Sequence, residues 1–443
     1  MSTAADDAND ATAAATAAAA ADEGSQGGLR AEVEAWLAEH WDPELSVEQW
    51  WRLVAAAGWV APHLTVEQGG RGLPQRAGRT VRATFAAFGA LQPPGGLGLL
   101  MAAPTILTLG TPEQIARHVP PILEGRLGWC QLFSEPGAGS DLAGLTTRAE
   151  RDGDRWIING QKVWSSQARE ADYGMLLART DFDVPKHAGI SWFALKLDQP
   201  GVTIRPLREM TGDAVFNEVF LDNAVVPADD LVGGAGNGWM AANTTLHFER
   251  TGIGAGGAHA GFPPPGPKGG VLGLKAGDAA RLRPPEGMVV TFADLVELAR
   301  EHGRADDPAI REKLARLHCY LQVGQWNAVR AKAEAAGGDA AAGASIASTG
   351  KIAQTRITKL SAEIGLDILG AGGLLAGPDA AASGKFAKAF LFARASSIYG
   401  GTDEIQRNIV AERTLGLPRE PSPDRKRPYR EVLHGLTRRD DTS

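Results

Sequence analysis

Cysteine is scarce in this sequence, because only Cys130 and Cys319 occur among its 443 residues. The two positions lie far apart and show no C-x-x-C spacing, which argues against structural zinc and fits a reducing compartment. We therefore expect a cytoplasmic protein without a metal site, in which both cysteines are buried thiols.

Long hydrophobic runs are also lacking. No stretch of about 18 apolar residues occurs, so no membrane-spanning helix is expected. Residues 1–28 are rich in Ala, Asp and Thr and contain neither a basic segment nor a Leu-rich one. This stretch does not resemble a secretory signal, and we expect it to be a disordered tail.

Positive charge is not in excess either. The 45 Lys and Arg residues are outnumbered by 52 Asp and Glu residues, which gives a net charge of −7. This balance does not favour binding to nucleic acid or to an anionic membrane. A polyanionic ligand would therefore need local basic groups.

The spacing of apolar residues changes twice along the chain and predicts three domains. Residues 29–127 follow helical spacing, and Thr111 before Pro112 is typical of a helix N-cap. Residues 128–236 contain short β-branched or apolar segments bounded by Gly, Asn and Asp, as strands do. Residues 237–420 return to helical spacing and predict a helical bundle, which is followed by a C-terminal tail at 421–443.

Two segments need a separate interpretation. Residues 255–287 are rich in Gly and Pro, so we expect a long surface insertion without regular structure. Tryptophans cluster in the N-terminal third, where they could form a ligand cage, although packing between helices is the favoured interpretation. They are Trp36, Trp41, Trp50, Trp51 and Trp59.

One short region carries the strongest functional signal. Residues 134–141, with the sequence S-E-P-G-A-G-S-D, combine two glycines and a proline with hydroxyl and carboxylate side chains. Backbone amides and hydroxyls of such a turn can approach a ligand closely. We expect a strand to carry Trp164, Ser165 and Ser166, where it could offer an indole face and a hydroxyl to a flat heterocycle.

These residues resemble the flavin site of the acyl-CoA dehydrogenase family. The E-Q-G-G-R-G run at 67–72, the I-Y-G-G-T run at 398–402 and the I-Q-R-N-I-V-A-E-R-T-L-G-L-P-R ending at 405–419 resemble the same family. The resemblance covers nearly all of residues 29–420. It implies an α+β fold with an N-terminal helical domain, a central β-barrel-like domain and a C-terminal four-helix bundle, with FAD as the cofactor.

The resemblance also implies a role for each matching residue. Ser134 resembles the hydroxyl at the flavin pyrimidine edge, and Ser140 the serine beside the acyl-thioester, in contact with cofactor and substrate. Trp164 resembles the tryptophan packed on the isoalloxazine, and Ser166 the hydroxyl near flavin N5. The remaining cofactor-binding candidates are Phe133, Thr402, Glu404 and the pair Gly372 and Gly373, which would approach the flavin of a neighbouring subunit.

The resemblance implies a catalytic base, but the position where the family often has it is not a glutamate in this sequence. Gly400 stands where the family often has glutamate, but its N–H could still donate to the thioester oxygen. A second family position for the base is matched by Glu249, which is followed by Arg250, a substrate-binding candidate. Burial beside an apolar flavin would raise the pKa of Glu249 and make it a better proton acceptor near neutral pH. An ordinary Glu249 salt bridge is the alternative.

The implied reaction is FAD-dependent dehydrogenation of an acyl-CoA to the trans-2-enoyl-CoA, with electrons passed to an electron-transfer flavoprotein. A dimer or tetramer, of one chain or of two, is expected. Leu369 stands near the position of a cofactor-binding glutamine, and Arg300 lacks its motif's phenylalanine. These departures keep open a non-catalytic partner subunit, and an oxidase is a third alternative.

Overall fold

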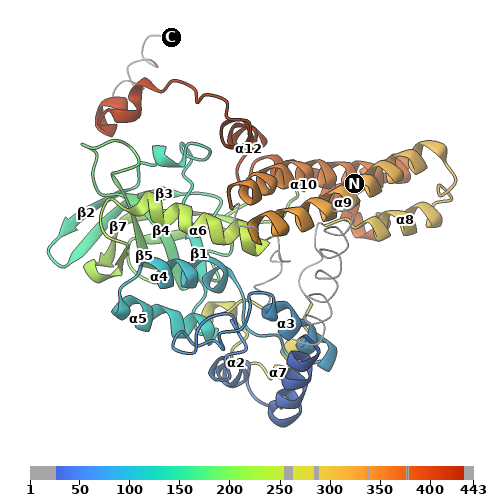
Figure 1. Cartoon of the computed structure of the whole chain (residues 1–443), viewed down its shortest axis with the longest axis horizontal. Coiled ribbons are helices and arrows are strands. Elements are labelled where there is room, and N and C mark those ends of the chain that lie inside the picture. The colour runs from blue at the N-terminus through green and yellow to red at the C-terminus, as the bar shows by residue number, and fades with distance from the viewer. Residues whose placement is uncertain are drawn as a thin grey trace, which may run out of the picture.

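The computed structural model describes residues 26–253, 263–283, 289–336, 340–375, 377 and 379–433. Figure 1 shows helices from the N-terminal third, a sheet beside them, and a bundle of long helices that extends away from both. Most of the expected tail at 1–28 lies outside the described residues, and residues 26–28 belong to a helix that spans 26–40. Among the described helices, none combines the length and apolar character needed to span a bilayer.

Short helices with apolar faces form the N-terminal part. They are the helix at 26–40, α2 (Val47–Ala56), α3 (Ala77–Phe88), a π-helical turn (Gly98–Ala102), α4 (Ala103–Leu109) and α5 (Pro112–Leu123). Thr111 caps α5 through a capping box with Gln114, so the predicted N-cap is confirmed. Trp50 and Trp51 are fully buried and donate to the backbone oxygens of Leu91 and Gln92. These two indoles therefore pack between helices, as favoured.

The central part, here called the β-domain, is an eight-stranded sheet in the order β6, β7, β3, β2, β4, β5, β8, with β1 paired in parallel to β4. The strands are β1 (Trp129–Leu132), β2 (Arg148–Asp152), β3 (Arg155–Lys162), β4 (Tyr173–Arg179), β5 (Ile190–Lys196), β6 (Val202–Leu207), β7 (Phe216–Pro227) and β8 (Leu231–Val232). Alternate residues of β4 enter two different cores, so both faces of the sheet are covered.

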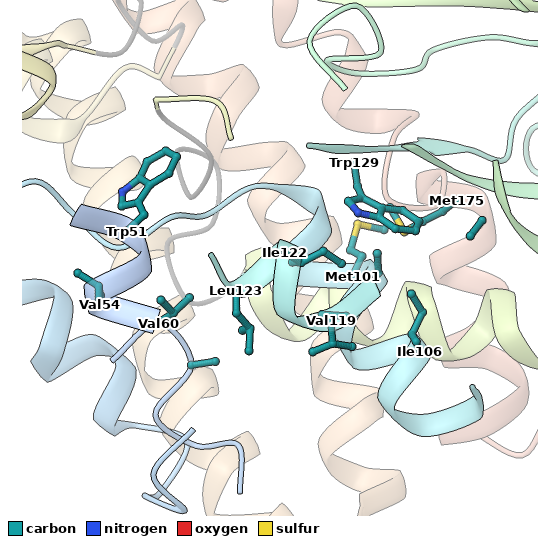
Figure 2. Close-up of a cluster of buried hydrophobic side chains, with 14 of the residues drawn as sticks. Trp51, Val54, Val60, Met101, Ile106, Val119, Ile122, Leu123, Trp129 and Met175 are labelled. Atoms are coloured by element: carbon teal, nitrogen blue, oxygen red, sulfur yellow. The ribbon is translucent and has the colours of Figure 1, made fainter. Parts of the chain in front are cut away.

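One of these cores joins the β-domain to the N-terminal helices. Figure 2 shows Met101, Ile106 and Val119 of the helices gathered with Trp129 and Met175 of the sheet. Removing this apolar surface from water is the main favourable contribution to holding the two parts together. The second core contains Cys130, Leu176 and Phe193 and is formed by side chains of the β-domain itself.

Helix α6 (Gly238–Ile253) packs mainly on the sheet and on α4. The predicted domain boundary at residue 237 had assigned this helix to the C-terminal bundle. Ala241 and Ala242 of α6 are fully buried. The hydroxyls of Thr245 and Thr105 lie 3.0 Å apart, which links α6 to α4 through a buried hydrogen bond.

The Gly- and Pro-rich segment is partly ordered, which corrects the expectation of a surface insertion without regular structure. Residues 263–283 include α7 (Ala276–Arg281), and Ala276 is fully buried. Val47 of α2 donates to the Leu274 oxygen, and Ala276 donates to the Leu45 oxygen. The small residues of this segment allow close approach, because a Cβ on Gly277 would lie 2.7 Å from the Pro43 side chain. Residues 254–262 and 284–288 lie outside the described part.

The C-terminal bundle consists of α8 (Phe292–Glu301), α9 (Pro308–Ala336), α10 (Ala340–Leu369), α11 (Lys385–Phe392) and α12 (Asp403–Ile409). Helices α9 and α10 lie side by side over most of their length (Figure 1). Leu317 of α9 is buried in the bundle core. Cys319, two residues later and about 200° further round the helix, is exposed. The expectation that both thiols are buried is therefore wrong for Cys319.

Candidate functional site

The 134–141 turn follows β1 and opens toward solvent. The backbone groups of Glu135 and Ala138 exchange two hydrogen bonds of 3.0 and 3.1 Å, which closes the turn. A Cβ added to Gly137 or Gly139 would have no atom within 4 Å. Ser134 is half-buried and Ser140 is exposed. The turn therefore leaves the two predicted serines accessible to a ligand.

A buried ion pair between Lys162 and Glu135 fixes the 134–141 turn on the β-domain. The Lys162 ammonium donates to the Glu135 carboxylate at 2.8 Å and to the Phe133 backbone oxygen at 3.0 Å. The same carboxylate accepts from the backbone N–H groups of Thr146 and Thr147. Burial alone would raise the pKa of Glu135, but Lys162 and these donors lower it to about 2. Phe133 is itself buried and contributes its carbonyl to the network.

The Trp164 loop lies next to the turn, because the Val163 N–H donates to the Ser134 oxygen at 3.0 Å. Strand β3 ends at Lys162, so the expectation that a strand carries Trp164 is wrong, and Trp164 lies in the loop that follows. Its φ of 63° is unfavourable for a large side chain, and its indole is 57% exposed. Strained backbone with an exposed ring is typical of ligand sites.

Backbone hydrogen bonds to strand β7 also fix the Trp164 loop. Ser165 and Asn217 exchange backbone hydrogen bonds of 3.0 and 3.1 Å. The Ser165 hydroxyl and the Asn217 side-chain oxygen are buried without a partner among the described residues. Ser166, the predicted hydroxyl, follows directly and is half-buried.

Glu249 lies on α6, one helical turn after the buried Thr245, and therefore on the same side of the helix. It is half-buried. Arg250 follows it in the helix, but its side chain lies outside the described part of the chain. The fully buried Thr245 and its bond to Thr105 fix the rotation of α6 one turn before the predicted base.

Gly400 and Thr402 lie together at the start of α12. Gly400 has a φ of 64°, and its oxygen accepts from the Gln406 side chain at 3.0 Å. Its N–H donates to no residue in the described part of the chain. Thr402 caps α12 by accepting from the Ile405 N–H, whereas Glu404 is exposed and pairs with Arg407 at 3.5 Å. The glycine N–H is therefore held in place and available to a ligand.

Gly372 and Gly373 lie at the opposite end of α10 from this turn. Lys351 pairs with Asp403 at 3.1 Å, which places the start of α12 beside the first half of α10. The end of α10 at Leu369 is about 27 Å further along the helix at 1.5 Å per residue. The structure therefore does not bring the glycine pair together with Thr402 within one chain.

These residues fit a flat cofactor with polar edges. The exposed Trp164 offers an aromatic face beside the open 134–141 turn, whose amides and hydroxyls can meet polar atoms. The unpartnered Ser165 hydroxyl is the kind of buried polar atom that a ligand or water satisfies. A flavin meets these requirements.

Sequence reasoning found the turn and the tryptophan but missed Glu135, Lys162 and Asn217. A lysine at the end of an apolar strand was the only signal for the buried pair, and nothing in the sequence connected it to Glu135.

A helical part, a sheet part and a helical bundle, with a glycine turn and a tryptophan at the end of a strand, define a three-part protein with a site that fits a flat cofactor. The chain belongs to the acyl-CoA dehydrogenase family. Residues 22–126 match the N-terminal domain of that family, residues 130–224 the middle domain, and residues 286–415 the C-terminal domain. These matches confirm the predicted fold class, and the chain is an oxidoreductase that acts on acyl-CoA.

Individual relatives extend the likeness over most of the chain. Acyl-CoA dehydrogenase IpdE1 of Mycobacterium tuberculosis is 38% identical over 410 residues, covering 88% of this chain and 98% of the relative. A solved structure described as the Tcur3481-Tcur3483 steroid ACAD is 27% identical, with a TM-score of 0.67, covering 90% of this chain and 98% of its own. The ChsE4-ChsE5 complex of M. tuberculosis is also 27% identical, with a TM-score of 0.63 and coverages of 89% and 98%.

Proposed function

We propose that this protein binds FAD and dehydrogenates an acyl-CoA between Cα and Cβ, releasing the trans-2-enoyl-CoA, and that the electrons pass to an electron-transfer flavoprotein. The observation that carries the proposal is the exposed Trp164, held at a φ of 63° beside the open 134–141 turn. Such a conformation is costly for tryptophan and is retained where a ring must be presented.

Different residues of this chain would have different roles in the reaction. Bound FAD would supply the acceptor for the hydride that leaves Cβ. Glu249 would remove the α-proton, since it is a half-buried carboxylate on a helix whose rotation is fixed by Thr245. The Gly400 N–H would donate to the thioester oxygen and stabilise the negative charge that develops there. Trp164 and Ser134 would orient the cofactor.

A bulky, ring-bearing acyl group is the proposed substrate class. Gly400 has no side chain, and a Cβ at this position would meet no atom within 4 Å. A site without the usual glutamate side chain leaves room for a wide acyl group. One solved relative is described as a steroid ACAD, which supports a steroid-derived acyl group here as well.

We also propose that the active form is an oligomer. Residues on one side of α9 are apolar and exposed, and an apolar patch of this kind is typical of a protein interface. They are Cys319, Val323, Trp326 and Val329. The distance between Gly372 and Thr402 along α10 supports a contribution of the glycine pair to the site of a neighbouring subunit.

Replacing Glu249 by Gln tests the mechanism. Because Gln has nearly the same shape but cannot accept the proton, the variant should keep its FAD and lose anaerobic bleaching of the flavin by substrate, by at least about a thousandfold in rate. Stopped-flow absorbance measures this rate. The matched control is Glu312→Gln, because Glu312 is an exposed helical carboxylate that pairs with Arg316 and has no proposed role in the site. Undiminished bleaching in Glu249→Gln would remove Glu249 from the mechanism.

The second candidate function is that of a partner subunit that completes the site of another chain. The absence of glutamate at Gly400 favours it, and one solved relative is a complex of two named chains, ChsE4 and ChsE5. The visible spectrum of the chain purified alone separates the candidates. A yellow protein that turns over acyl-CoA by itself supports the dehydrogenase, whereas a colourless one that gains flavin only with a second chain supports the partner role.

A further inference from the structure

Residues 421–433, here called the C-terminal strap, lie beyond the last family domain, which ends at residue 415. After α12 the chain leaves the bundle and crosses to the β-domain (Figure 1). There it forms a 3-10 turn (Pro423–Lys426) and a helical turn at 429–433. Residues 421–433 of the expected C-terminal tail are therefore docked on the β-domain. Residues 434–443 lie outside the described part of the chain.

Tyr429 is the anchor of the strap. It is only 4% exposed, and its hydroxyl donates to the Gly144 backbone oxygen. Its ring lies 3.8 Å from the guanidinium carbon of Arg179, within cation–π range. Its N–H donates to the Val184 oxygen at 2.9 Å, and Arg430 adds an ion pair of 3.0 Å with Asp183.

The anchor rests on the segment that directly follows Ser140. The buried Arg179 guanidinium donates to the backbone oxygens of Ala143 and Leu145, and to that of Lys186 in the loop between β4 and β5. Lys186 in turn pairs with Asp141 at 2.7 Å. Tyr429 and Arg179 therefore fix the strap, this loop and the end of the 134–141 turn to one another.

Two cations of the strap remain without an anion. Carboxylates nearby are engaged, because Asp141 pairs with Lys186 and both Asp424 and Glu431 pair with Arg427. Asp181 accepts from the Asp183 N–H. Arg425 and Lys426 are exposed and form no ion pair within the described part of the chain. The Arg430 N–H donates to the Phe182 oxygen at 2.9 Å, which holds the strap against this loop. Burial lowers the pKa of His187 in the loop, and the charges of Lys186 and Arg425 lower it further.

We propose that the C-terminal strap completes the acyl-CoA site, with Arg425 and Lys426 binding the phosphates of the nucleotide end of CoA. The inference rests on the proposed function, in which the thioester lies at Ser140. An extended carrier that left Ser140 along the docked segment would pass Asp141 and Lys186 and reach the strap. The protein has a net charge of −7, so local cations must attract the polyanionic carrier.

Calorimetric titration of the purified holoenzyme with CoA tests the proposal. The double variant Arg425→Gln/Lys426→Gln should weaken CoA binding about tenfold, the effect of losing two solvent-exposed ion pairs. Its KM for acyl-pantetheine, which lacks the nucleotide and its phosphates, should be unchanged. Arg427→Gln is the matched control, because Arg427 lies on the same turn but is occupied by Asp424 and Glu431.

A variant of the anchor residue Tyr429 gives a second test of the proposal. Tyr429→Ala should release the strap and weaken CoA binding to the same extent, and adding the double variant to it should change the affinity by less than about twofold. Circular dichroism and the flavin spectrum show that each variant is folded. Unchanged CoA binding in Arg425→Gln/Lys426→Gln, or an equal loss with acyl-pantetheine, overturns the proposal. Because CoA binding is measured without turnover, this result does not depend on whether the protein dehydrogenates acyl-CoA.

Discussion

Lys162 and Glu135 face each other inside the β-domain, where an isolated charge would be very unfavourable. Their side chains are 0% and 5% exposed. Desolvation makes such a pair a poor source of net stability, so its position beneath the 134–141 turn points to a role in fixing the turn. Both partners hold backbone groups of the turn region, through the Phe133 oxygen and the Thr146 and Thr147 N–H groups.

Replacing Lys162 by Met should destabilise the protein by about 3–5 kcal/mol, because it leaves the Glu135 carboxylate buried without its cation. Urea unfolding of the holoenzyme measures the free energy of unfolding. The double variant Glu135→Gln/Lys162→Met should recover a large part of the loss, since no uncompensated charge remains. A double variant as unstable as the sum of its single variants would contradict a direct pair.

The pH dependence of the free energy of unfolding gives an independent check of the same pair. The pKa of Glu135 is lowered from its ordinary value of 4.5 to about 2 in the folded protein. The ionised carboxylate therefore stabilises the fold above about pH 4.5, and this contribution is lost as the pH falls toward 2. In Lys162→Met the free energy should depend less on pH across this window.

At the residue scale, sequence reasoning succeeded where a local motif carries the chemistry. The 134–141 turn and Trp164 were found because glycine, serine and tryptophan are unusual in that order. The burial of Glu135 was not found, because it depends on Lys162 in a strand 27 residues later. The exposure of Trp164 also depends on long-range contacts, namely the hydrogen bonds that place Ser165 on Asn217.

At the scale of elements, α6 packs on the sheet and carries the predicted base, Glu249. Its first half is fixed by Ala241, Ala242 and Thr245, which are all fully buried. Glu249 lies one turn beyond the buried hydroxyl pair of Thr245 and Thr105. A small rotation of α6 would therefore move the carboxylate relative to the substrate.

Replacing Thr245 by Val should lower the rate of anaerobic flavin bleaching several-fold, because misplacing a catalytic group by less than an ångström is costly. The free energy of unfolding should change by only about 1 kcal/mol, since Thr105 keeps its bond to the Met101 oxygen. Stopped-flow bleaching and urea unfolding measure the two effects. Thr244→Val is the matched control on the exposed side of the helix, and an equal loss of rate there would exclude a positioning role for Thr245.

The elements themselves were largely predictable from periodicity and caps, as Thr111 and α5 show. The exception is α7 and the segment before it. Glycine and proline content predicted an irregular surface loop, but Ala276 is buried against α2. Local composition cannot reveal this, because small residues favour both open loops and close contacts such as that of Gly277 with Pro43.

At the scale of the whole molecule, the bundle leaves an apolar side of α9 exposed. Trp326 is 66% exposed on the side of the helix opposite the buried Leu317, and Val329, which is also 66% exposed, lies close to one turn further along from Trp326. Gly372 and Gly373 lie far along α10 from the Thr402 turn. Both features have a simple explanation if a second subunit packs on the bundle and each subunit contributes its glycine pair to the other's cofactor site.

Replacing Trp326 by Glu should therefore separate the subunits and weaken flavin binding together. The dissociation constant of the oligomer should rise by at least about tenfold, because a buried tryptophan at an interface commonly contributes 2 kcal/mol or more. Sedimentation velocity measures the assembly, and the flavin-to-protein absorbance ratio measures cofactor retention. Ala328→Glu is the matched control, since residue 328 is exposed but lies about 200° away from Trp326 around α9. An unchanged oligomer in Trp326→Glu would exclude this side of α9 as the interface, whereas dissociation with full flavin retention would exclude a contribution of the partner's glycine pair to the site.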